Sequence, residues 1–120
     1  MGTHEVWHAG EDLAARYLTG LGWQLIDRNW RCPAGELDII AIEPGPPAVV
    51  VFCEVKSRRG MGFGPPLEAI TAAKRNKLRE LALLWLRGQP RAVPRFRIDG
   101  VGVLLPPDGP HRITHLRGIG

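Results

Sequence analysis

Two short apolar runs contain three charged residues whose types could bind a metal ion and a phosphate. Asp38 stands in "GELDII" (35–40), and Glu54 and Lys56 stand in "FCEVKSR" (52–58). A buried charge is costly unless it is paired or holds an ion. Carboxylates without His or Cys suit Mg²⁺ or Mn²⁺, and a lysine beside them could stabilise charge that develops on a phosphate. The alternative is a structural ion cluster in which Lys56 is the counter-ion of both carboxylates.

Two further carboxylates could join this set. Glu11 lies on the apolar face of the first predicted helix, whose other members are Ala14, Leu18 and Leu21. Its side chain is therefore expected to point toward the core or into a cleft, where it becomes a third metal ligand if the helix packs over the strands. Otherwise Glu11 reaches solvent from the edge of the apolar face. Glu36 shares a strand face with Asp38 and is a secondary candidate.

A small set of helices and strands must position these charges. Periodicity and turn residues predict helices over 5–20 and 67–88, the second with an apolar stripe of Ile70, Ala73, Leu78, Leu81 and Trp85. The predicted strands cover 23–30, 36–43, 49–57 and 95–105, with a short edge strand at 111–118 and a glycine-rich loop at 58–66. The order αβββαβ indicates an α/β fold with a mixed central sheet flanked by helices.

The pairing of strands 36–43 and 49–57 decides whether the charges meet. A short loop joins these strands, so they are predicted to form an antiparallel hairpin. A turn centred near Pro46 places opposite each other the positions whose numbers sum to 92, and Asp38 then faces Glu54. A shift of one residue would separate the two carboxylates.

Composition sets the class of protein. The 120 residues are 44% hydrophobic and 23% charged, which suits a single domain over 1–120, with a core at about 5–105 and an edge strand or tail at 106–120. The net charge of +4 and the pI of about 9.7 favour an anionic partner such as nucleic acid. The chain shows no signal peptide and no apolar run of ~18 residues, which predicts a cytoplasmic protein without membrane contact.

Basic residues follow the carboxylates along the chain. Five of them are candidates for contacts with nucleic-acid phosphates: Arg58, Arg59, Lys74, Arg75 and Lys77. The first two come directly after the third strand, and the other three lie on the second helix. For the helical residues, Arg75 in particular, the alternative is a solvated basic face.

Asp38, followed on the next strand by Glu54-Val55-Lys56, resembles the signature of the PD-(D/E)XK nuclease superfamily. Over roughly residues 8–105, the chain resembles the YraN-like family of uncharacterised bacterial proteins in the segments "GEDLAARYL", "DRNWRCPAGELDIIA", "VVFCEVKSR", "FGPPLEAITAAKRNKLRELALLWL" and "RFRIDGVGV". That family is similar in outline to archaeal Holliday junction resolvases. The resemblance implies a restriction-endonuclease-like αβββαβ core.

The resemblance also implies roles for individual residues. Glu11, Asp38 and Glu54 match the acids of the first helix and of the second and third strands, Lys56 matches the lysine, and the backbone carbonyl of Val55 could complete the shell of a Mg²⁺ or Mn²⁺ ion. The implied reaction is metal-dependent hydrolysis of DNA phosphodiester bonds, with branched or structured DNA as substrate. A homodimer is compatible, because many nucleases of this fold work as dimers. Two alternatives stay open: a nucleic-acid-binding module without catalysis, and an interaction protein whose charged cluster is structural.

Overall fold

Two helices, a 3₁₀ turn and five strands form the part of the chain that the computed structural model describes, residues 2–60 and 66–120. Helix α1 covers Thr3–Gly20 and is followed by strands β1 (Gln24–Cys32), β2 (Gly35–Glu43) and β3 (Val49–Arg58). The 3₁₀ turn η1 (Pro66–Ala69) precedes helix α2 (Ala72–Arg87), and the chain continues with β4 (Phe96–Leu104) and β5 (Arg112–Leu116). The predicted element order αβββαβ is confirmed, and the edge strand expected at 111–118 is β5.

The strands form one sheet in the order β1-β2-β3-β4-β5. All neighbours are antiparallel except β3 and β4, which are parallel. A parallel pair cannot be joined by a tight turn, and α2 lies in the crossover between these two strands. The predicted α/β class with a mixed sheet flanked by helices is therefore confirmed.

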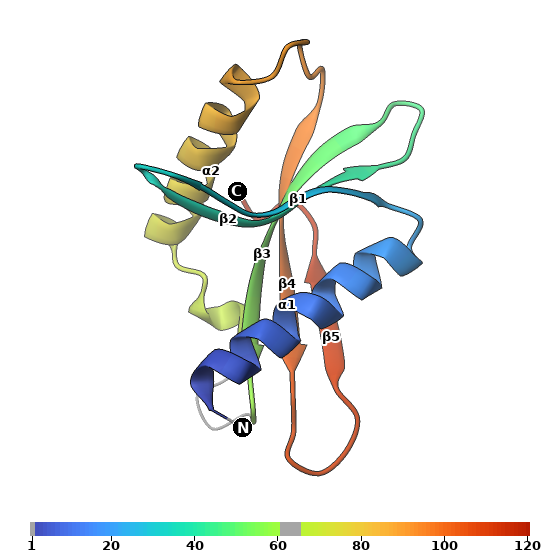
Figure 1. The fold of residues 1–120 in the computed structure, drawn as a ribbon, viewed down its shortest axis with the longest axis vertical. Helices are drawn as coiled ribbons and strands as arrows, with labels where there is room; N and C mark the ends of the chain where they lie inside the picture. The colour runs from blue at the N-terminus through green and yellow to red at the C-terminus, as the bar shows by residue number, and fades with distance from the viewer. Residues whose placement is uncertain (1, 61–65) are drawn as a thin grey trace.

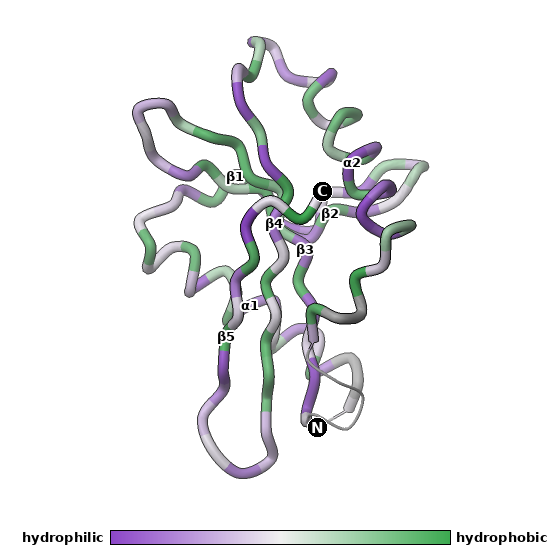
Figure 2. The backbone as a smooth tube through the Cα atoms, turned by 180° about the vertical axis from the view of Figure 1, so that it is seen from behind, coloured by the Kyte–Doolittle hydropathy of each residue, from purple (hydrophilic) through white to green (hydrophobic). Residues whose placement is uncertain are grey.

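Each helix covers its own hydrophobic cluster on the sheet. Leu18 of α1 packs in one cluster with Ile39, whereas Leu81 of α2 packs in the other with Phe52 and Ile98. Figure 1 shows α1 crossing β4 and β5, and α2 beside the β1–β2 hairpin. Seen from behind, hydrophobic residues run through the central strands, and hydrophilic ones recur along α2 (Figure 2). In the described ranges, neither helix is both long and apolar enough to cross a membrane.

The register of the β2–β3 hairpin agrees with the prediction. Ile39 pairs with Cys53 and Ile42 pairs with Val50, so paired positions sum to 92. The pair formed by Ile39 and Cys53 is the last one on the side away from the turn. Asp38 and Glu54 stand one step beyond it, where the two strands separate.

The predicted helix at 67–88 is wrong in its first turn. Residues Pro66–Ala69 form the 3₁₀ turn, and α2 begins after Thr71, whose side chain accepts a hydrogen bond from the backbone N–H of Lys74. The physical reason lies on β4: a Cβ at Gly100 or Gly102 would stand 3.1 Å or 3.0 Å from atoms of Leu67. The 3₁₀ turn can thus lay Leu67 directly on the backbone of β4, while Thr71 caps a separate helix.

Two residues of the predicted apolar faces are also exposed. Leu21, expected on the face of the first helix, follows the end of α1 and is 43% exposed. Ala73, expected in the stripe of the second helix, lies in the first turn of α2 and faces solvent, while Ala82 is buried in its place. The error at Leu21 follows from extending a helical period beyond the true end of the helix, whereas Ala73 lies inside α2 but on its exposed side.

Candidate active site

A side chain replaces the backbone ladder where β2 separates from β3. The backbone N–H of Val55 donates a 2.8 Å hydrogen bond to Oδ2 of Asp38. In a continuous ladder that N–H would pair with the backbone of β2 instead. The Asp38 carboxylate therefore accepts the hydrogen bond of a β3 backbone N–H that β2 no longer accepts, and this contact fixes Asp38 beside Glu54.

Strand β2 twists sharply at Asp38. Residues two apart in a regular strand share a face, yet Leu37 belongs to the cluster under α2 and Ile39 to the cluster under α1. Along its other edge, β2 pairs with β1. Arg28 pairs with Ile39 and Trp30 pairs with Leu37, so Asn29 of β1 lies opposite Asp38. Strand β2 therefore changes face at Asp38.

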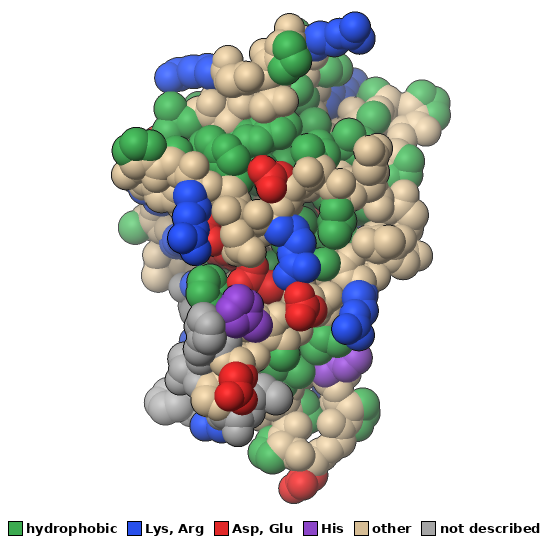
Figure 3. Space-filling model, viewed as in Figure 1, with side chains coloured by type: hydrophobic (Ala, Val, Ile, Leu, Met, Phe, Trp, Pro, Cys, Tyr) green, Lys and Arg blue, Asp and Glu red, His purple; other side chains and the backbone are tan. Residues whose placement is uncertain are grey.

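Asp38 and Glu54 form a tight pair of buried carboxylates. Asp38 is 7% exposed and Glu54 is 4% exposed. Burial raises the pKa of Asp38 strongly, and so do a hydrogen bond with Glu54 and the negative charges of Glu54 and Glu11. Without a cation, the pair therefore retains a proton at neutral pH. Figure 3 shows acidic side chains gathered on this face of the molecule, between α1 and the β1–β2 hairpin.

Lys74, not Lys56, is the cation that meets this pair. Its Nζ lies 3.0 Å from Oε2 of Glu54, although this buried oxygen lacks hydrogen-bond geometry with it. Lys56 is half-buried and forms no ion pair with the carboxylates of residues 2–60 and 66–120. The interpretation in which Lys56 is the counter-ion of both carboxylates is therefore wrong. The lysine that lies with Glu54 comes from the first turn of α2.

Glu11 lies in a second acidic group. It is 1% exposed, as its position on the apolar face predicts. The side-chain amide of Asn29, with its nitrogen turned inward, donates at 2.9 Å to Oε1 of Glu11 and at 2.9 Å to Oε1 of Glu36. Burial raises the pKa of Glu11, although the charge of Arg28 opposes the shift. Oε2 of Glu11 is buried and has no hydrogen-bond partner among the described residues.

The donor set at Asp38 and Glu54 fits a hard divalent cation such as Mg²⁺ or Mn²⁺. In the described ranges, no three Asp, Glu, His or Cys side chains are placed to hold a metal ion. Two buried carboxylates nevertheless suffice for Mg²⁺, which keeps several waters and is often held by one or two carboxylates plus substrate phosphates. Oε2 of Glu54, which has the ion pair with Lys74 but no hydrogen bond among the described residues, is the atom that such an ion would contact.

The five basic residues predicted to contact phosphate occupy different places. Arg58 ends β3 with a buried Nε that has no partner among the described residues, and Arg59 follows it on the surface. Lys77 forms an exposed pair with Glu80 at 3.3 Å. Arg75 lines a small cavity of about 80 Å³ between η1, β5 and the C-terminal tail.

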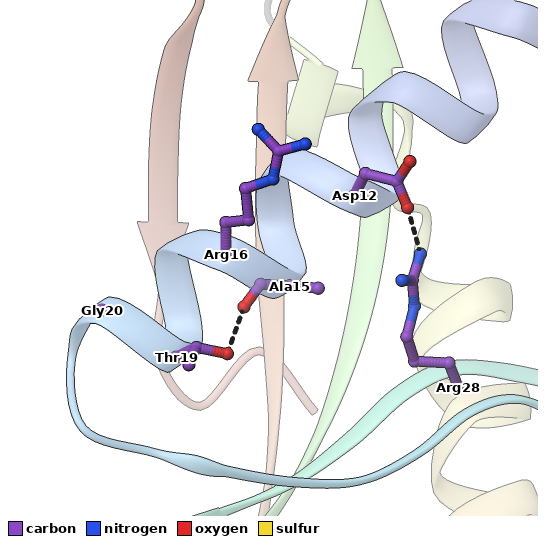
Figure 4. A pocket seen from close by; sticks show the side chains of 6 residues that line it. All are labelled: Asp12, Ala15, Arg16, Thr19, Gly20 and Arg28. Carbon is purple, nitrogen blue, oxygen red and sulfur yellow. Dashed lines mark hydrogen bonds and ion pairs between the residues drawn. The ribbon is translucent and has the colours of Figure 1, made fainter.

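An open groove of about 530 Å³ runs between α1 and β1 (Figure 4). Asp12 and Arg28 form an ion pair of 2.8 Å across it, and Arg16 extends from α1 beside them. Neither Asp38 nor Glu54 lines it. Arg28, which lines this groove, is also the residue whose charge acts to lower the pKa of Glu11.

Sequence reasoning missed two sets of polar residues. Asn29 carries a backbone φ of 56°, a left-handed conformation that Asn tolerates better than most residues; only its type hinted at this. Asp99, a buried residue of β4, accepts from Arg97 at 2.7 Å and contacts Nε2 of His115 at 2.8 Å. The signal in the sequence was an Asp within an apolar strand, but spacing could not predict a partner such as His115, which lies 16 residues away.

Comparison with known proteins identifies close relatives. The model of a family described as uncharacterised protein family UPF0102 matches residues 10–103. A UPF0102 protein of Renibacterium salmoninarum is 45% identical over 116 residues, which are 97% of this chain and 96% of that protein. UPF0102 proteins of Nocardia farcinica and Mycobacterium ulcerans are each 48% identical over 92% of this chain, and the matches cover 84% and 90% of those proteins. The predicted resemblance to uncharacterised bacterial proteins is confirmed.

Proposed function

The chain belongs to the uncharacterised protein family UPF0102, and we propose that it is a metal-dependent endonuclease that hydrolyses DNA phosphodiester bonds. The observation that carries the proposal is the buried pair Asp38 and Glu54, which meet where β2 leaves β3. Two adjacent buried carboxylates are unfavourable on their own, and such strained charge pairs cluster at functional sites. Branched or structured DNA is the proposed substrate class.

The side chains around the pair suit phosphoryl chemistry. Asp38 and Glu54 would hold a Mg²⁺ or Mn²⁺ ion, and the backbone carbonyl of Val55 would complete the protein ligands. A bound ion would polarise the phosphate and supply a nucleophilic water. Lys56 stands two residues after Glu54 on the same strand and has no carboxylate partner among the described residues. Its ammonium would stabilise the negative charge that develops on the phosphate.

Basic residues around the pair would hold the substrate backbone. Lys74 already lies at Glu54, and Lys77 stands one helical turn further along the same face of α2. Arg58 ends the strand that carries Glu54 and Lys56, and Arg59 follows it. These contacts position a phosphate chain without reading its sequence. A homodimer would provide one site for each strand of a duplex.

A non-catalytic module that binds nucleic acid is the second candidate function. The ion pair of Lys74 with Glu54 favours it, because this ammonium already compensates one of the two buried charges. In that case the carboxylates stabilise the junction of α2 with the sheet, and the basic residues bind phosphates without hydrolysis.

Calorimetric titration of Mn²⁺ into the metal-free protein tests the proposal. The wild type is compared with Asp38→Asn, Glu54→Gln and the control Asp27→Asn, which changes an exposed residue of β1. We expect binding in the wild type and the control, and its loss in both site variants. The same four proteins are then incubated with Mg²⁺ and labelled four-way, flapped and single-stranded DNA.

Cleavage of any of these DNAs by the wild type and the control, but not by the site variants, supports the nuclease. The proposal is overturned if the wild type binds no Mn²⁺ with or without DNA. A metal-independent gel shift without cleavage would instead support the non-catalytic module.

A further inference from the structure

A series of contacts leads from helix α2 across the candidate site to strand β1. Lys74 of α2 lies 3.0 Å from Glu54, and Glu54 shares a hydrogen bond with Asp38. Asp38 lies opposite Asn29 of β1, and Arg28 stands next to Asn29 on that strand. Arg28 in turn lines the open groove between α1 and β1. The acidic pair, Asp38 and Glu54, therefore lies between α2 and the groove in this series.

Of the two guanidinium groups in the groove, one is compensated and the other is not. Arg28 donates to Asp12 at 2.8 Å, and this hydrogen bond is the main cause of the lowered pKa of Asp12. Arg16 extends from α1 beside this pair and forms no ion pair with any described residue, although its charge also acts on Asp12 (Figure 4). Because Asp12 and Arg28 balance each other, the groove keeps the positive charge of Arg16. An anion from solution can therefore bind there.

The shape of the groove suits one strand of nucleic acid. Its volume of about 530 Å³ is that of a site for a small ligand or a short piece of chain. Ala15 and Gly20 line it with small side chains, and a Cβ added at Gly20 would meet no other described residue within 4 Å. A positively charged groove of this kind follows the phosphates of a single strand. A duplex, whose major groove alone is about 12 Å wide, is too broad to enter.

We propose that this groove binds the single-stranded arm of a branched DNA whose duplex lies along α2, an inference that rests on the proposed nuclease function. With a phosphate at the acidic pair, the duplex would lie on the side of Lys74 and the outgoing strand on the side of Arg28. Phosphates of this strand would contact Arg16 and the N–H groups of Arg28 that Asp12 does not use. None of the described residues that line the groove is aromatic, so binding is electrostatic and tolerates any base sequence. The preferred substrate is then a flap or a fork.

Binding of labelled oligo(dT) in EDTA tests the groove without metal or cleavage. Fluorescence anisotropy is measured from low to moderate salt for the wild type, Arg16→Gln and the control Arg91→Gln, which removes an exposed charge between α2 and β4. We expect Arg16→Gln to weaken binding and to make the slope of log K against log salt shallower by about 0.7, the value for one phosphate contact of a single strand. The control should keep the affinity and slope of the wild type.

Two substitutions at Gly20 change the charge of the groove without touching its arginines. Gly20→Gln and Gly20→Glu place side chains of similar size in the open space at this position. Only the second adds a negative charge, so we expect Gly20→Glu to bind oligo(dT) more weakly than Gly20→Gln. Asp12→Asn releases Arg28 and should make the salt slope steeper by about 0.7. Equal binding by the two Gly20 variants contradicts the proposal, because a strand in the groove must sense the added charge.

A comparison of flapped DNA with duplex DNA in EDTA tests the assignment to an arm. Arg16→Gln should weaken binding of the flapped DNA and leave binding of the duplex unchanged. Equal weakening of both would place the duplex itself at the groove and overturn the assignment.

The outcomes also separate the groove from the nuclease site. Oligo(dT) binding reports on the groove, whereas the Mn²⁺ titration reports on Asp38 and Glu54. Oligo(dT) binding that is unchanged in Arg16→Gln overturns the groove, even where the wild type binds Mn²⁺ and cleaves DNA. Binding that is lost in Arg16→Gln, in a protein that takes up no Mn²⁺, supports the groove as a site for a single strand and overturns the nuclease.

Discussion

At the residue scale, the pair of Asp38 and Glu54 is held in an arrangement that two ionised carboxylates would avoid. One oxygen of Asp38 is committed to the N–H of Val55, so the side chain cannot rotate away from Glu54. Burial and the charge of Glu54 both raise the pKa of Asp38. In the proposed metal site, a cation would replace the proton that the pair retains. Stability of the metal-free protein and ion binding would therefore be opposed at this point.

Replacing Asp38 by Asn should stabilise the metal-free protein. An amide oxygen can still accept from Val55, and the charge that burial disfavours is gone. Because the folded-state pKa of Asp38 is raised, its contribution to stability is fully present below the unfolded-state pKa of about 3.9 and is lost as pH rises. The Tm advantage of Asp38→Asn should therefore grow from pH 5 to pH 8.5. Thermal unfolding with EDTA measures it, and a constant or negative difference contradicts the expected shift.

Lys74 should compete with a metal ion for Glu54. Its ammonium lies 3.0 Å from Oε2 of Glu54, where a bound cation would need room. Lys74→Met is expected to raise Mn²⁺ affinity by roughly tenfold, or about 1.4 kcal/mol, and to lower the Tm of the metal-free protein because Glu54 loses its counter-ion. Lys77→Met, one turn away in an exposed pair, is the control and should change neither. Weaker Mn²⁺ binding in Lys74→Met would show that this lysine assists the ion.

At the element scale, local patterns predicted most strands and helices, and the loop between β2 and β3 was enough to predict their register. The break at Thr71 escaped detection because 67–88 is apolar at helical spacing throughout. The packing of Leu67 on the glycines of β4 depends on residues more than thirty positions away. The change of face in β2 at Asp38 was also beyond local patterns, because it places Leu37 and Ile39 in clusters under different helices.

The edge strand β5 should depend on Asp99. This buried carboxylate accepts from Arg97, contacts His115 of β5, and accepts the N–H of Gly118. Burial acts to raise the pKa of Asp99, but these hydrogen bonds outweigh it and hold the pKa below its usual range. Asp99→Asn leaves Arg97 and His115 without their anion and should cost about 2–4 kcal/mol at pH 7.

The sign of the pKa shift adds a second test of Asp99. A lowered pKa gives stability above the unfolded-state value of about 3.9 that is lost below it, so the difference between wild type and Asp99→Asn should shrink as pH falls. Urea unfolding at pH 7 and pH 3.5 measures this difference, with the exposed Asp108→Asn as control. Hydrogen exchange at Gly118 should become faster. Unchanged stability at pH 7 would mean that β5 is held by its backbone ladder alone.

At the scale of the whole molecule, sequence reasoning found the buried carboxylates of the candidate site and the register that brings Asp38 and Glu54 together, but not the lysine beside them. Asp38, Glu54 and Glu11 stood out because they are charges at apolar positions, and all three are buried. The lysine beside Glu54 was not identified, because Lys56 is close to Glu54 in sequence whereas Lys74 reaches it only through the packing of α2 on the sheet. Asn29 gave only the weak signal of its residue type, since a single Asn in a strand is ordinary.

The fold also divides the basic residues of α2 between two sides of the molecule. Lys74 reaches Glu54, and Lys77 runs beside Gly35 at the turn of the β1–β2 hairpin. Arg75, between them in sequence, hydrogen-bonds the carbonyl of Ile70 at 3.5 Å and lines the cavity under the C-terminal tail. A DNA backbone that approaches the acidic pair should therefore meet Lys77 and not Arg75.

Salt dependence of DNA binding tests this division. Each phosphate contact contributes a slope of about −0.9 to the plot of log K against log salt for duplex DNA. Lys77→Ala should make the slope shallower by about that amount, whereas Arg75→Ala should leave it unchanged. Fluorescence anisotropy of a labelled four-way junction, with EDTA to prevent cleavage, measures both variants from low to moderate salt. A loss of slope in Arg75→Ala alone would place the DNA on the face of β5, and the acidic pair would then lie too far from the backbone to act on it.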